Sequence, residues 1–295
     1  MHHSPIRRML LLAAGTLPLA GSGAALAKTL VAEDAAGQQL AALEARSGGR
    51  LGVAALDAGS GRRTEWRAQE RFPFCSTFKL IAVSALLQRA AGTPGLLDKR
   101  IAYTQQDLAP YSPVSEKHVN EGMTLAALGA AALQYSDNTA ANLILRELGG
   151  PAAVTRFARE IGDTKFRLDR WETALNSALP GDSRDTTTPA AMAQSLQRLL
   201  LGDALDPAGR QQLVDWMLGN TTGAARIRAG VAGDWRVADK TGTGDYGTSN
   251  DVGVLWPPGR APIVLAIYFT QAQAKAKPRN DVLADATRIV VGALS

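Results

Sequence analysis

Strand-like segments stand at both ends of this chain, and alanine-rich helical segments fill its middle. The strand candidates are short apolar runs bounded by turn residues, and they cover 51–56, 64–68, 235–238, 251–256 and 263–269. The helix candidates repeat apolar residues at helical spacing, and they cover 34–46, 124–133, 139–148, 152–161, 189–201, 207–218 and 281–294. Strands at both ends with helices between them predict an antiparallel sheet domain into which a helical domain is inserted.

We therefore predict an α/β (α+β) fold with two domains, an antiparallel sheet flanked by helices and an inserted all-helical domain. The sheet-containing domain is expected to comprise 28–67 and 220–295, and the helical domain 68–219. A stretch without periodicity, 163–188, lies between two of the predicted helices. Because loops of this length in a compact domain are usually functional or disordered, this stretch is a candidate part of a functional site.

Residues 1–27 have the pattern of an export signal. Arg7 and Arg8 precede a mostly apolar run, and Ala25 and Ala27 define a small-x-small cleavage site. The run is interrupted by glycine and proline and is shorter than the ~20 residues that a membrane span needs. The paired arginines suit either a twin-arginine or a general export signal. We expect an exported, periplasmic protein without a membrane anchor, acting as a monomer.

The chain has only three histidines and one cysteine, Cys75. Two histidines lie in the expected signal, so His118 is the only one in the body of the chain. A zinc site built from these residue types needs about three or four ligands, and a single cysteine has no intramolecular disulfide partner. No metal or cofactor is therefore expected. The net charge falls from +5 to +3 without the two signal arginines. The basic residues form no concentrated stripe in the sequence, so nucleic acid is not an expected partner.

Four short motifs follow one another along the chain. They are Ser76-Thr77-Phe78-Lys79, Ser136-Asp137-Asn138, Glu172-Thr173-Ala174-Leu175-Asn176 and Lys240-Thr241-Gly242. The first opens a predicted helix, the second lies between two helices, the third lies in the aperiodic stretch, and the fourth ends a strand. A Ser-x-x-Lys pair alone is expected by chance about once in a chain of this size. All four motifs together, in this order, make coincidence improbable.

The first motif has a definite chemical meaning. Residues three apart on a helix share a face, so the Lys79 ammonium is expected to reach the Ser76 hydroxyl. A serine is a poor nucleophile until a base takes its proton, and with His118 unassigned that base must be a lysine or a carboxylate. A lysine can serve only if burial or a second cation lowers its pKa, and Lys240 is a candidate for that cation.

Together the motifs resemble those of the class A serine β-lactamases, and the resemblance covers essentially the whole chain after the signal. It implies a sheet domain and a helical domain with the active site in the cleft between them. It also implies an Ω-loop over about 167–185. The implied substrates are small-molecule β-lactams, opened through a covalent acyl-enzyme and released by hydrolysis without a cofactor.

The resemblance implies five catalytic residues. Ser76 resembles the nucleophile that opens the β-lactam ring, and Lys79 resembles its activating lysine. Glu172 resembles the base that activates the hydrolytic water, which Asn176 helps to hold. Ser136 resembles the hydroxyl that passes a proton to the departing ring nitrogen. Whether Lys79 or Glu172 takes the Ser76 proton during acylation stays open at this point.

The resemblance also implies a substrate-binding set. Its members are Tyr111, Asn138, Arg226, Lys240, Thr241, Gly242 and Thr243. Tyr111 resembles an aromatic residue at the mouth of the cleft, and Asn138 resembles a contact to the substrate's acylamide. Lys240 and Thr241 resemble the anchor for the substrate carboxylate. The backbone N–H groups of Ser76 and Thr243 would form the oxyanion hole.

The sequence also matches and departs from the family at other positions. Arg170 and Asp185 resemble a salt bridge that clamps the Ω-loop. Many members carry an arginine soon after the Lys-Thr-Gly strand, but 247–250 offers none, and Arg226 resembles the alternative arginine of other members. Some carbapenem-hydrolysing members join the cysteine before the nucleophile to one near 244. Glycine stands at 244 here, so that disulfide is absent.

Two other functions share part of this pattern. A penicillin-binding D,D-peptidase has the Ser-x-x-Lys and Lys-Thr-Gly elements but lacks an efficient deacylation base, and a non-catalytic β-lactam-sensing domain stays acylated. Glu172 with Asn176 favours the hydrolase, and no membrane segment of the kind that sensors carry appears after residue 28. The expected function is hydrolysis of penicillins and cephalosporins, conferring β-lactam resistance. The order of preference among β-lactam classes stays open, and His118 has no assigned role.

Overall fold

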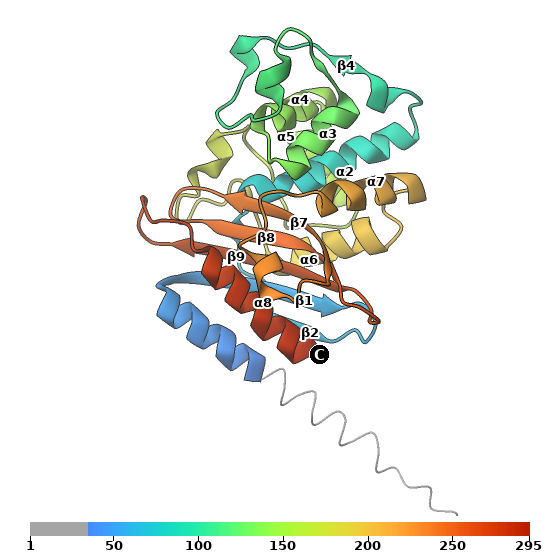
Figure 1. Ribbon diagram of the computed structural model, residues 1–295. Coiled ribbons are helices and arrows are strands. Elements are labelled where there is room, and N and C mark those ends of the chain that lie inside the picture. Colours follow the sequence, from blue (N-terminus) through green and yellow to red (C-terminus); the bar gives the residue numbers. More distant parts are fainter. Residues whose placement is uncertain (1–34) are drawn as a thin grey trace, which may run out of the picture.

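The computed structural model describes residues 35–295, so the expected signal at 1–27 lies outside the described residues. The described chain forms a five-stranded antiparallel sheet with helices on both of its faces (Figure 1). This confirms the predicted α+β fold class. The predicted division at 67 and 219 stays a prediction. No helix within 35–295 is long and apolar enough to cross a membrane.

The sheet is assembled from the two ends of the chain. Its strands are β1 (Gly49–Asp57), β2 (Arg63–Trp66), β7 (Arg236–Thr243), β8 (Ser249–Trp256) and β9 (Ile263–Gln271), in the spatial order β2-β1-β9-β8-β7. β1 pairs with β9 along its whole length, with Val53 opposite Ile267. The first and last strands therefore meet at the centre, and β7 is left as an edge strand that faces the helical part of the molecule.

Both faces of the sheet are covered by helices. On one face, the helix over 35–47 and α8 (Asn280–Leu294) lie side by side (Figure 1) and pack on strand residues such as Val53. On the other face, α6 (Pro189–Leu196) packs on β1, β8 and β9, and Ala54 belongs to that second core. Successive strand residues thus enter opposite cores, as the period of two requires. This explains why β1, β8 and β9 are apolar almost throughout.

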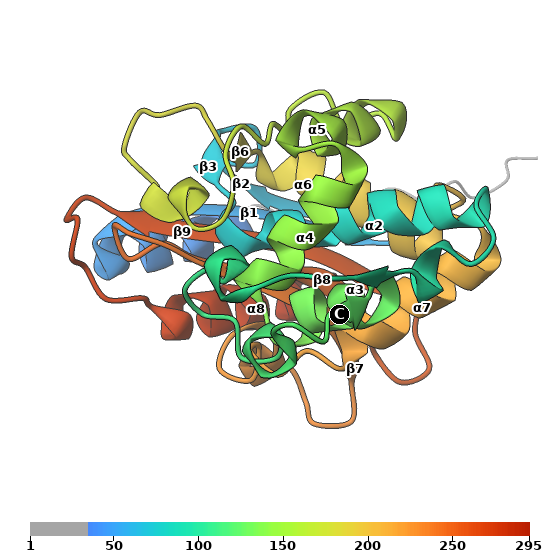
Figure 2. The same cartoon turned by 90° about the horizontal axis from the view of Figure 1, so that it is seen from above.

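The middle of the chain forms the helical part. Its long helices are α2 (Phe78–Ala91), α3 (Leu125–Gln134), α4 (Asn138–Leu148), α5 (Pro151–Glu160) and α7 (Pro207–Leu218). α2 runs through the centre of this group, against α3, α4, α5 and α7 (Figure 2). Every residue from 78 to 87 is buried, which fits a helix that is apolar on nearly all sides.

Two small sheets tie loops to this framework. β3 (Phe72–Pro73) pairs with β6 (Thr186–Thr187), which joins the segment before Ser76 to the end of the Ω-loop. β4 (Arg100–Ile101) pairs with β5 (Met123–Thr124) at the far side of the helical part. The β3–β6 pair matters for the site, because it joins the segment that leads to Ser76 to the C-terminal end of the Ω-loop.

Two predicted helices differ in detail. The predicted helix 189–201 is α6 only as far as Leu196, and a π-helical turn, Gln197–Leu201, follows it. Gly202 N–H donates to the carbonyl of Gln197, five residues back, at 2.8 Å. The helix predicted to open at Ser76 begins as a 3₁₀ turn, Cys75–Thr77, so the serine precedes the α-helical part.

Candidate active site

Ser76 and Lys79 meet at the N-terminal end of α2. Ser76 lies in the 3₁₀ turn and Lys79 one turn further on, and Lys79 Nζ donates to Ser76 Oγ at 2.9 Å. This confirms the contact expected from the three-residue spacing. Ser76 is 8% exposed, while Lys79 is fully buried. The serine oxygen therefore faces the cleft with the lysine behind it.

Lys79 is held by acceptors from three directions. Its Nζ donates to the Ser136 carbonyl at 2.7 Å and to Asn138 Oδ1 at 2.6 Å, and it lies 3.1 Å from Glu172 Oε1. Burial lowers the pKa of Lys79, although the neighbouring Glu172 carboxylate opposes this shift. A lysine with a lowered pKa can exchange protons with its neighbours, which a solvated lysine near neutral pH does far less readily.

Glu172 approaches the same serine from the Ω-loop. Ser76 Oγ donates to Glu172 Oε1 at 3.0 Å, and Asn176 Nδ2 donates to Oε2 at 2.6 Å. Asn142 on α4 fixes the backbone at this point, since Glu172 N–H donates to Asn142 Oδ1 at 3.0 Å and Asn142 Nδ2 donates to the Glu172 carbonyl at 2.9 Å. Asn176 Oδ1 is buried without a partner among the described residues. It is an acceptor available to a small polar molecule beside the carboxylate.

The Ω-loop is closed on itself by the expected salt bridge. Arg170 Nε lies 2.5 Å from Asp185 Oδ2, and Asp185 Oδ1 accepts the backbone N–H groups of Asp169 and Arg170. Arg170 also donates to Ser177 Oγ at 3.0 Å. Asp185 is fully buried, so the clamp holds the two legs of the loop together directly beside Glu172.

The Ser136-Asp137-Asn138 motif forms the start of α4, with Asp137 as its N-cap and Asn138 as its first residue. Asp137 is fully buried and caps the helix, accepting the N–H of Ala140 at 2.8 Å while also binding Ser115 through N–H and hydroxyl. Ser136 has a positive φ of 57°, which turns its carbonyl toward Lys79. Asn138 connects Lys79 to the loop carrying Tyr111, because its Nδ2 donates to the Pro110 carbonyl at 2.7 Å. The motif thus orients three groups of the site at once.

Lys240 reaches the cleft from the edge strand β7. Its Nζ donates to Ser136 Oγ at 3.0 Å and to the Thr241 carbonyl at 2.8 Å. Burial and, next to it, repulsion by the Lys79 ammonium hold the pKa of Lys240 well below its usual range. Ser136 Oγ is also 3.4 Å from Lys79 Nζ. The serine hydroxyl is therefore shared between two buried lysines.

Gly242 is required by the close approach of β7 to the serine turn. A Cβ at this position would lie 2.6 Å from the Phe74 carbonyl oxygen, a contact that real side chains do not make. Asn250 on β8 reinforces the same junction, since its Nδ2 donates to the carbonyls of Pro73 and Phe74 at 2.9 and 3.0 Å. The strand and the turn that carries Ser76 are thus held in contact.

Arg226 is buried and its guanidinium is largely occupied. It donates to the carbonyls of Gly242 and Asn250 at 2.8 and 2.7 Å, to Asn280 Oδ1 at 2.8 Å and to Thr243 Oγ1 at 2.7 Å. Burial lowers its pKa. Because Thr243 Oγ1 accepts from Arg226, the Thr243 hydroxyl proton is free to point elsewhere.

These residues enclose a cavity of about 390 Å³. Its lining comprises Ser76, Tyr111, Ser136, Asn138, Asn176, Thr222, Arg226, Thr241, Gly242 and Thr243. Nine of the twelve residues predicted from the sequence line it, and Lys79, Glu172 and Lys240 lie behind Ser76 and Ser136, within hydrogen-bond distance of them. Tyr111 is 62% exposed at the rim. The cavity is large enough for a small bicyclic molecule.

Several positioning residues have no signature in the sequence. Thr222 lines the cavity and shares a hydrogen bond with Thr241, while Asn142, Asn250 and Asn280 hold Glu172, the serine turn and Arg226. Each is an ordinary polar residue, far in sequence from what it contacts. Only the tertiary fold identifies them.

Cys75 and His118 take no part in the cavity. Cys75 is buried and unpaired, and burial raises the pKa of its thiol. A Cβ at Gly244 would lie 2.6 Å from Cys75 Sγ, so the glycine makes room for the thiol. His118 lies in the 3₁₀ turn Ser115–His118, 3.4 Å from Glu121. No group of three or more His, Cys, Asp or Glu residues within 35–295 is arranged to hold a metal ion.

Comparison with known sequences gives consistent matches along the chain. The profile described as the Beta-lactamase enzyme family matches residues 35–294. β-Lactamase OXY-1 of Klebsiella oxytoca is 53% identical over 294 residues, covering 100% of both chains. A carbapenem-hydrolyzing β-lactamase KPC, also from Klebsiella oxytoca, is 54% identical over 289 residues, covering 98% of this chain and 97% of the relative.

Comparison with solved structures extends the likeness to three dimensions. A β-lactamase from Desulfarculus baarsii has a TM-score of 0.88 at 56% identity, covering 89% of this chain and 98% of its own. A mutant of the class A β-lactamase of the last common ancestor of Gram-negative bacteria has a TM-score of 0.85 at 60% identity, covering 88% of this chain and 98% of its own. Both the sequence and the fold thus have extensive counterparts.

Proposed function

We infer that this chain hydrolyses the β-lactam ring and confers resistance to β-lactam antibiotics, because it belongs to the class A β-lactamase family. We further propose residue roles that rest on the geometry of the site. One observation carries them: the carboxylate of Glu172 contacts Ser76 Oγ at 3.0 Å while Asn176 holds its other oxygen at 2.6 Å. A base in that place suits an enzyme that hydrolyses its own acyl-enzyme, rather than a penicillin-binding or sensing protein that stays acylated.

In acylation, Ser76 Oγ attacks the lactam carbonyl carbon, and the C–N bond of the ring then breaks. Both candidate bases touch the serine oxygen, since Lys79 Nζ is 2.9 Å and Glu172 Oε1 3.0 Å away. The hydroxyl proton is directed at Glu172, which favours the carboxylate as its acceptor, with Lys79 as the cation that supports the developing oxyanion of serine. The backbone N–H groups of Ser76 and Thr243 would stabilise the charge on the lactam oxygen.

The ring nitrogen needs a proton as the C–N bond breaks. Ser136 Oγ accepts from Lys240 Nζ at 3.0 Å, so its own hydrogen can be donated into the cleft. The proton that Ser136 gives up is then replaced from Lys79 or Lys240, both of which lie within 3.4 Å and have lowered pKa values. This arrangement supports the role of Ser136 as the proton donor to nitrogen.

Before deacylation, the proton that Glu172 took from Ser76 passes to the lysine side that gave one up, since Lys79 Nζ lies 3.1 Å from Glu172 Oε1. A water then attacks the Ser76 ester carbonyl, Glu172 takes a proton from that water, and this proton passes to Ser76 Oγ as the ester C–O bond breaks and the acid product departs. The unpartnered acceptor Asn176 Oδ1 beside Glu172 supports a water position between the two side chains. Because the Glu172 backbone is fixed by Asn142 on α4, its carboxylate needs little rearrangement before it acts.

Substrate recognition is proposed to centre on β7. The substrate carboxylate would lie against Lys240, Thr241 and the freed hydroxyl of Thr243, and Arg226 acts by orienting Thr243 and adding positive charge. Asn138 and Tyr111 would contact the acylamide side and the rim. Penicillins and cephalosporins are the proposed substrates, and one relative at 54% identity is named as carbapenem-hydrolyzing, which adds carbapenems to the classes to be measured.

The location and assembly state are likewise proposals. Residues 1–27 have the charge and apolar pattern of an export signal, which supports action in the periplasm. We propose a monomer, since every proposed catalytic group comes from one chain.

Turnover of a chromogenic cephalosporin by the purified protein tests this function. Many product molecules per enzyme are expected, and Ser76→Ala should form neither product nor adduct. A single stoichiometric burst followed by silence would instead favour a penicillin-binding D,D-peptidase or a sensing domain. Rates with one penicillin, one cephalosporin and one carbapenem then rank the substrate classes.

A further inference from the structure

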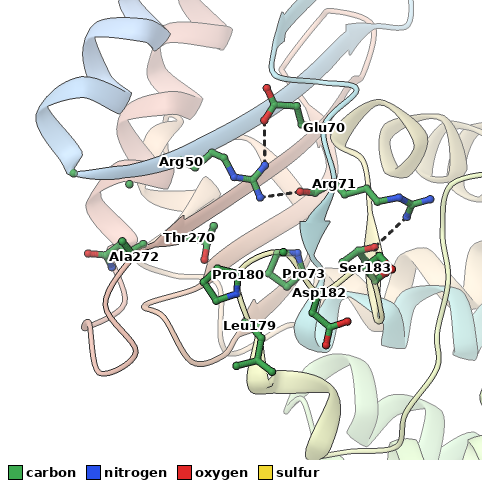
Figure 3. A pocket seen from close by; sticks show the side chains of 16 residues that line it. Arg50, Glu70, Arg71, Pro73, Leu179, Pro180, Asp182, Ser183, Thr270 and Ala272 are labelled. Carbon is green, nitrogen blue, oxygen red and sulfur yellow. Dashed lines mark hydrogen bonds and ion pairs between the residues drawn. The ribbon is translucent and has the colours of Figure 1, made fainter.

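A second and larger cavity lies behind the Ω-loop. Its volume is about 810 Å³, against about 390 Å³ for the cleft at Ser76. It is bounded by the loop segment 178–183 on one side and by the ends of β1 and β9 on the other (Figure 3). Cavities of roughly 300–1,000 Å³ are the usual size for small-molecule sites. None of the residues assigned to the β-lactam cleft lines this cavity.

The polar lining carries one cation without a counter-charge. Arg50 lies 3.2 Å from Glu70, and its guanidinium stacks over Phe72 at 3.8 Å. Asp182 is paired with Arg184 at 2.8 Å. Arg71, by contrast, donates only to neutral oxygens, the carbonyl of Lys165 at 2.8 Å and the hydroxyl of Thr186 at 3.0 Å.

The charge balance around Arg71 therefore favours an anion. Arg71 has no ion pair among residues 35–295, and both acidic residues of the lining already have arginine partners. A guanidinium binds carboxylates through charge-assisted hydrogen bonds. Since only one cation is unpaired, the complementary ligand carries a single negative charge.

The rest of the lining provides an apolar surface. Leu179 and Pro180 form part of the Ω-loop wall, Pro73 from β3 lies near Pro180, and Ala272 lies at the opposite side of the cavity (Figure 3). Leu179 is 45% exposed, so an apolar ligand placed against it would remove that surface from water. A flat hydrocarbon body with one carboxylate matches both features.

We propose that this cavity is a binding site for an organic monocarboxylate with a compact apolar body, anchored by Arg71, and that its occupancy holds the Ω-loop segment 178–183 in place. A ligand that binds only when the segment 178–183 lies in its present position stabilises that position by mass action. The segment continues directly from Asn176, which lines the β-lactam cleft. The site is nevertheless separate from that cleft, so its existence does not depend on the roles assigned to Ser76 or Glu172.

Calorimetric titration of the purified protein with 1-naphthaleneacetate tests the proposal, with the neutral 1-naphthaleneacetamide as the matched ligand. The carboxylate is expected to bind with a dissociation constant of about 1 mM or lower, and the amide about tenfold more weakly. Amide chemical shifts should move at Leu179, Thr270 and Ala272. Hydrogen exchange across 178–183 should slow when the ligand is bound.

Variants separate this site from the cleft. Arg71→Gln should weaken carboxylate binding about tenfold, while Arg89→Gln, at an exposed arginine that also binds only a backbone carbonyl, should leave it unchanged. Ala272→Trp should fill the cavity and abolish binding even if Arg71→Gln folds poorly. Thr243→Val should bind as the parent does. Equal binding of acid and amide, equal binding by Arg71→Gln, shifts centred on 240–243, or unaltered exchange across 178–183 would each overturn the proposal.

Discussion

The two sides of the β-lactam cleft hold their charged groups in different ways. On the helical side, which we call the reaction side, Ser76, Lys79, Ser136 and Glu172 are bonded mainly to one another's side chains. On the β7 side, which we call the recognition side, Lys240 and Arg226 donate largely to backbone carbonyls of Thr241, Gly242 and Asn250. The first arrangement can move protons, whereas the second fixes positive charge in place.

This difference predicts different kinetic signatures for the two sides. A change on the reaction side removes an interaction made only while bonds form and break, so it lowers kcat. A change on the recognition side removes binding that substrate and transition state share, so it raises KM. Lys240 belongs to both, because it reaches Ser136 Oγ from the recognition side.

The largest effect is expected from Glu172→Gln on the reaction side. The amide cannot accept the proton of the hydrolytic water, so deacylation should slow by about 10³-fold. Mass spectrometry after mixing with a cephalosporin should show an adduct on Ser76 that persists far longer than in the parent. Glu116→Gln, at an exposed glutamate, is the control. Equal adduct lifetimes in Glu172→Gln and the parent would remove Glu172 from deacylation.

Lys240→Met should lower activity while raising stability. Loss of a buried cation at Ser136 and at the carboxylate site should reduce kcat/KM by about 100-fold. The same change relieves a desolvated charge next to Lys79, which should add about 1–2 kcal/mol to the free energy of unfolding at pH 7. Urea unfolding monitored by fluorescence measures the second effect, and loss of stability in Lys240→Met would refute it.

The pH dependence of that gain has a definite sign. The folded pKa of Lys240 is lowered from 10.5, so above the folded value the unfolded chain binds a proton that the native protein lacks. The stability of the parent therefore rises with pH toward 10.5. The advantage of Lys240→Met should shrink as pH rises toward 10.5, and an advantage that grew with pH would contradict the assignment.

A smaller effect, confined to binding, is expected from Thr243→Val. The hydroxyl can donate to the substrate carboxylate, so its loss should raise KM about tenfold with little change in kcat. Arg226 also loses an acceptor in this variant, so Thr243→Val and Arg226→Lys should be non-additive in a double-mutant cycle. Thr93→Val, in an exposed turn, is the control. A fall in kcat with unchanged KM would place the Thr243 hydroxyl on the reaction side instead.

Much of the fold and the contact between Ser76 and Lys79 were predictable because their signals are local. Strand and helix periods located all five sheet strands and α3, α4, α5, α7 and α8, and the Ser-x-x-Lys spacing alone predicted the contact between Ser76 and Lys79. The other assignments came from matching motifs to a known family. The π-helical turn after α6 and the exact end of β2 were not predictable, because tertiary contacts and not local preference decide them.

The supports of the recognition side were not predictable for a different reason. Arg226 was singled out, yet its partners Asn250 and Asn280 lie far along the chain and have no motif. The buried acids Asp239 and Asp251 look like ordinary strand residues in the sequence. Their burial depends on the segment 220–228 folding over β7 and β8, where Asp239 binds Arg228 and Asn220 and Asp251 accepts the Ile227 N–H.

The effects expected from these two acids are on stability alone, and they should differ. Asp239→Asn leaves Arg228 without the carboxylate 2.7 Å away and should cost about 2–3 kcal/mol of unfolding free energy. Asp251 is fully buried, one of its oxygens has no partner within the described residues, and burial and the nearby Asp239 hold its pKa well above its usual range. An amide keeps the acceptor for Ile227, so Asp251→Asn should cost less than about 1 kcal/mol.

The pH dependence of stability separates the two acids further. With a raised folded pKa, Asp251 keeps its proton in the native protein at pH values where the unfolded chain has released it, so this residue stabilises less as pH rises above 3.8. Asp251→Asn removes that penalty and should gain on the parent in urea unfolding as pH rises above 3.8. Burial also raises the pKa of Asp239, although Arg228 opposes the shift, so Asp239→Asn should gain less with pH and stay below the parent because Arg228 has lost its partner. If both variants lost stability equally, Asp251 would be an ionised partner of Arg226. The positive charge of the recognition side would then be neutralised by a buried carboxylate and not only solvated by backbone carbonyls.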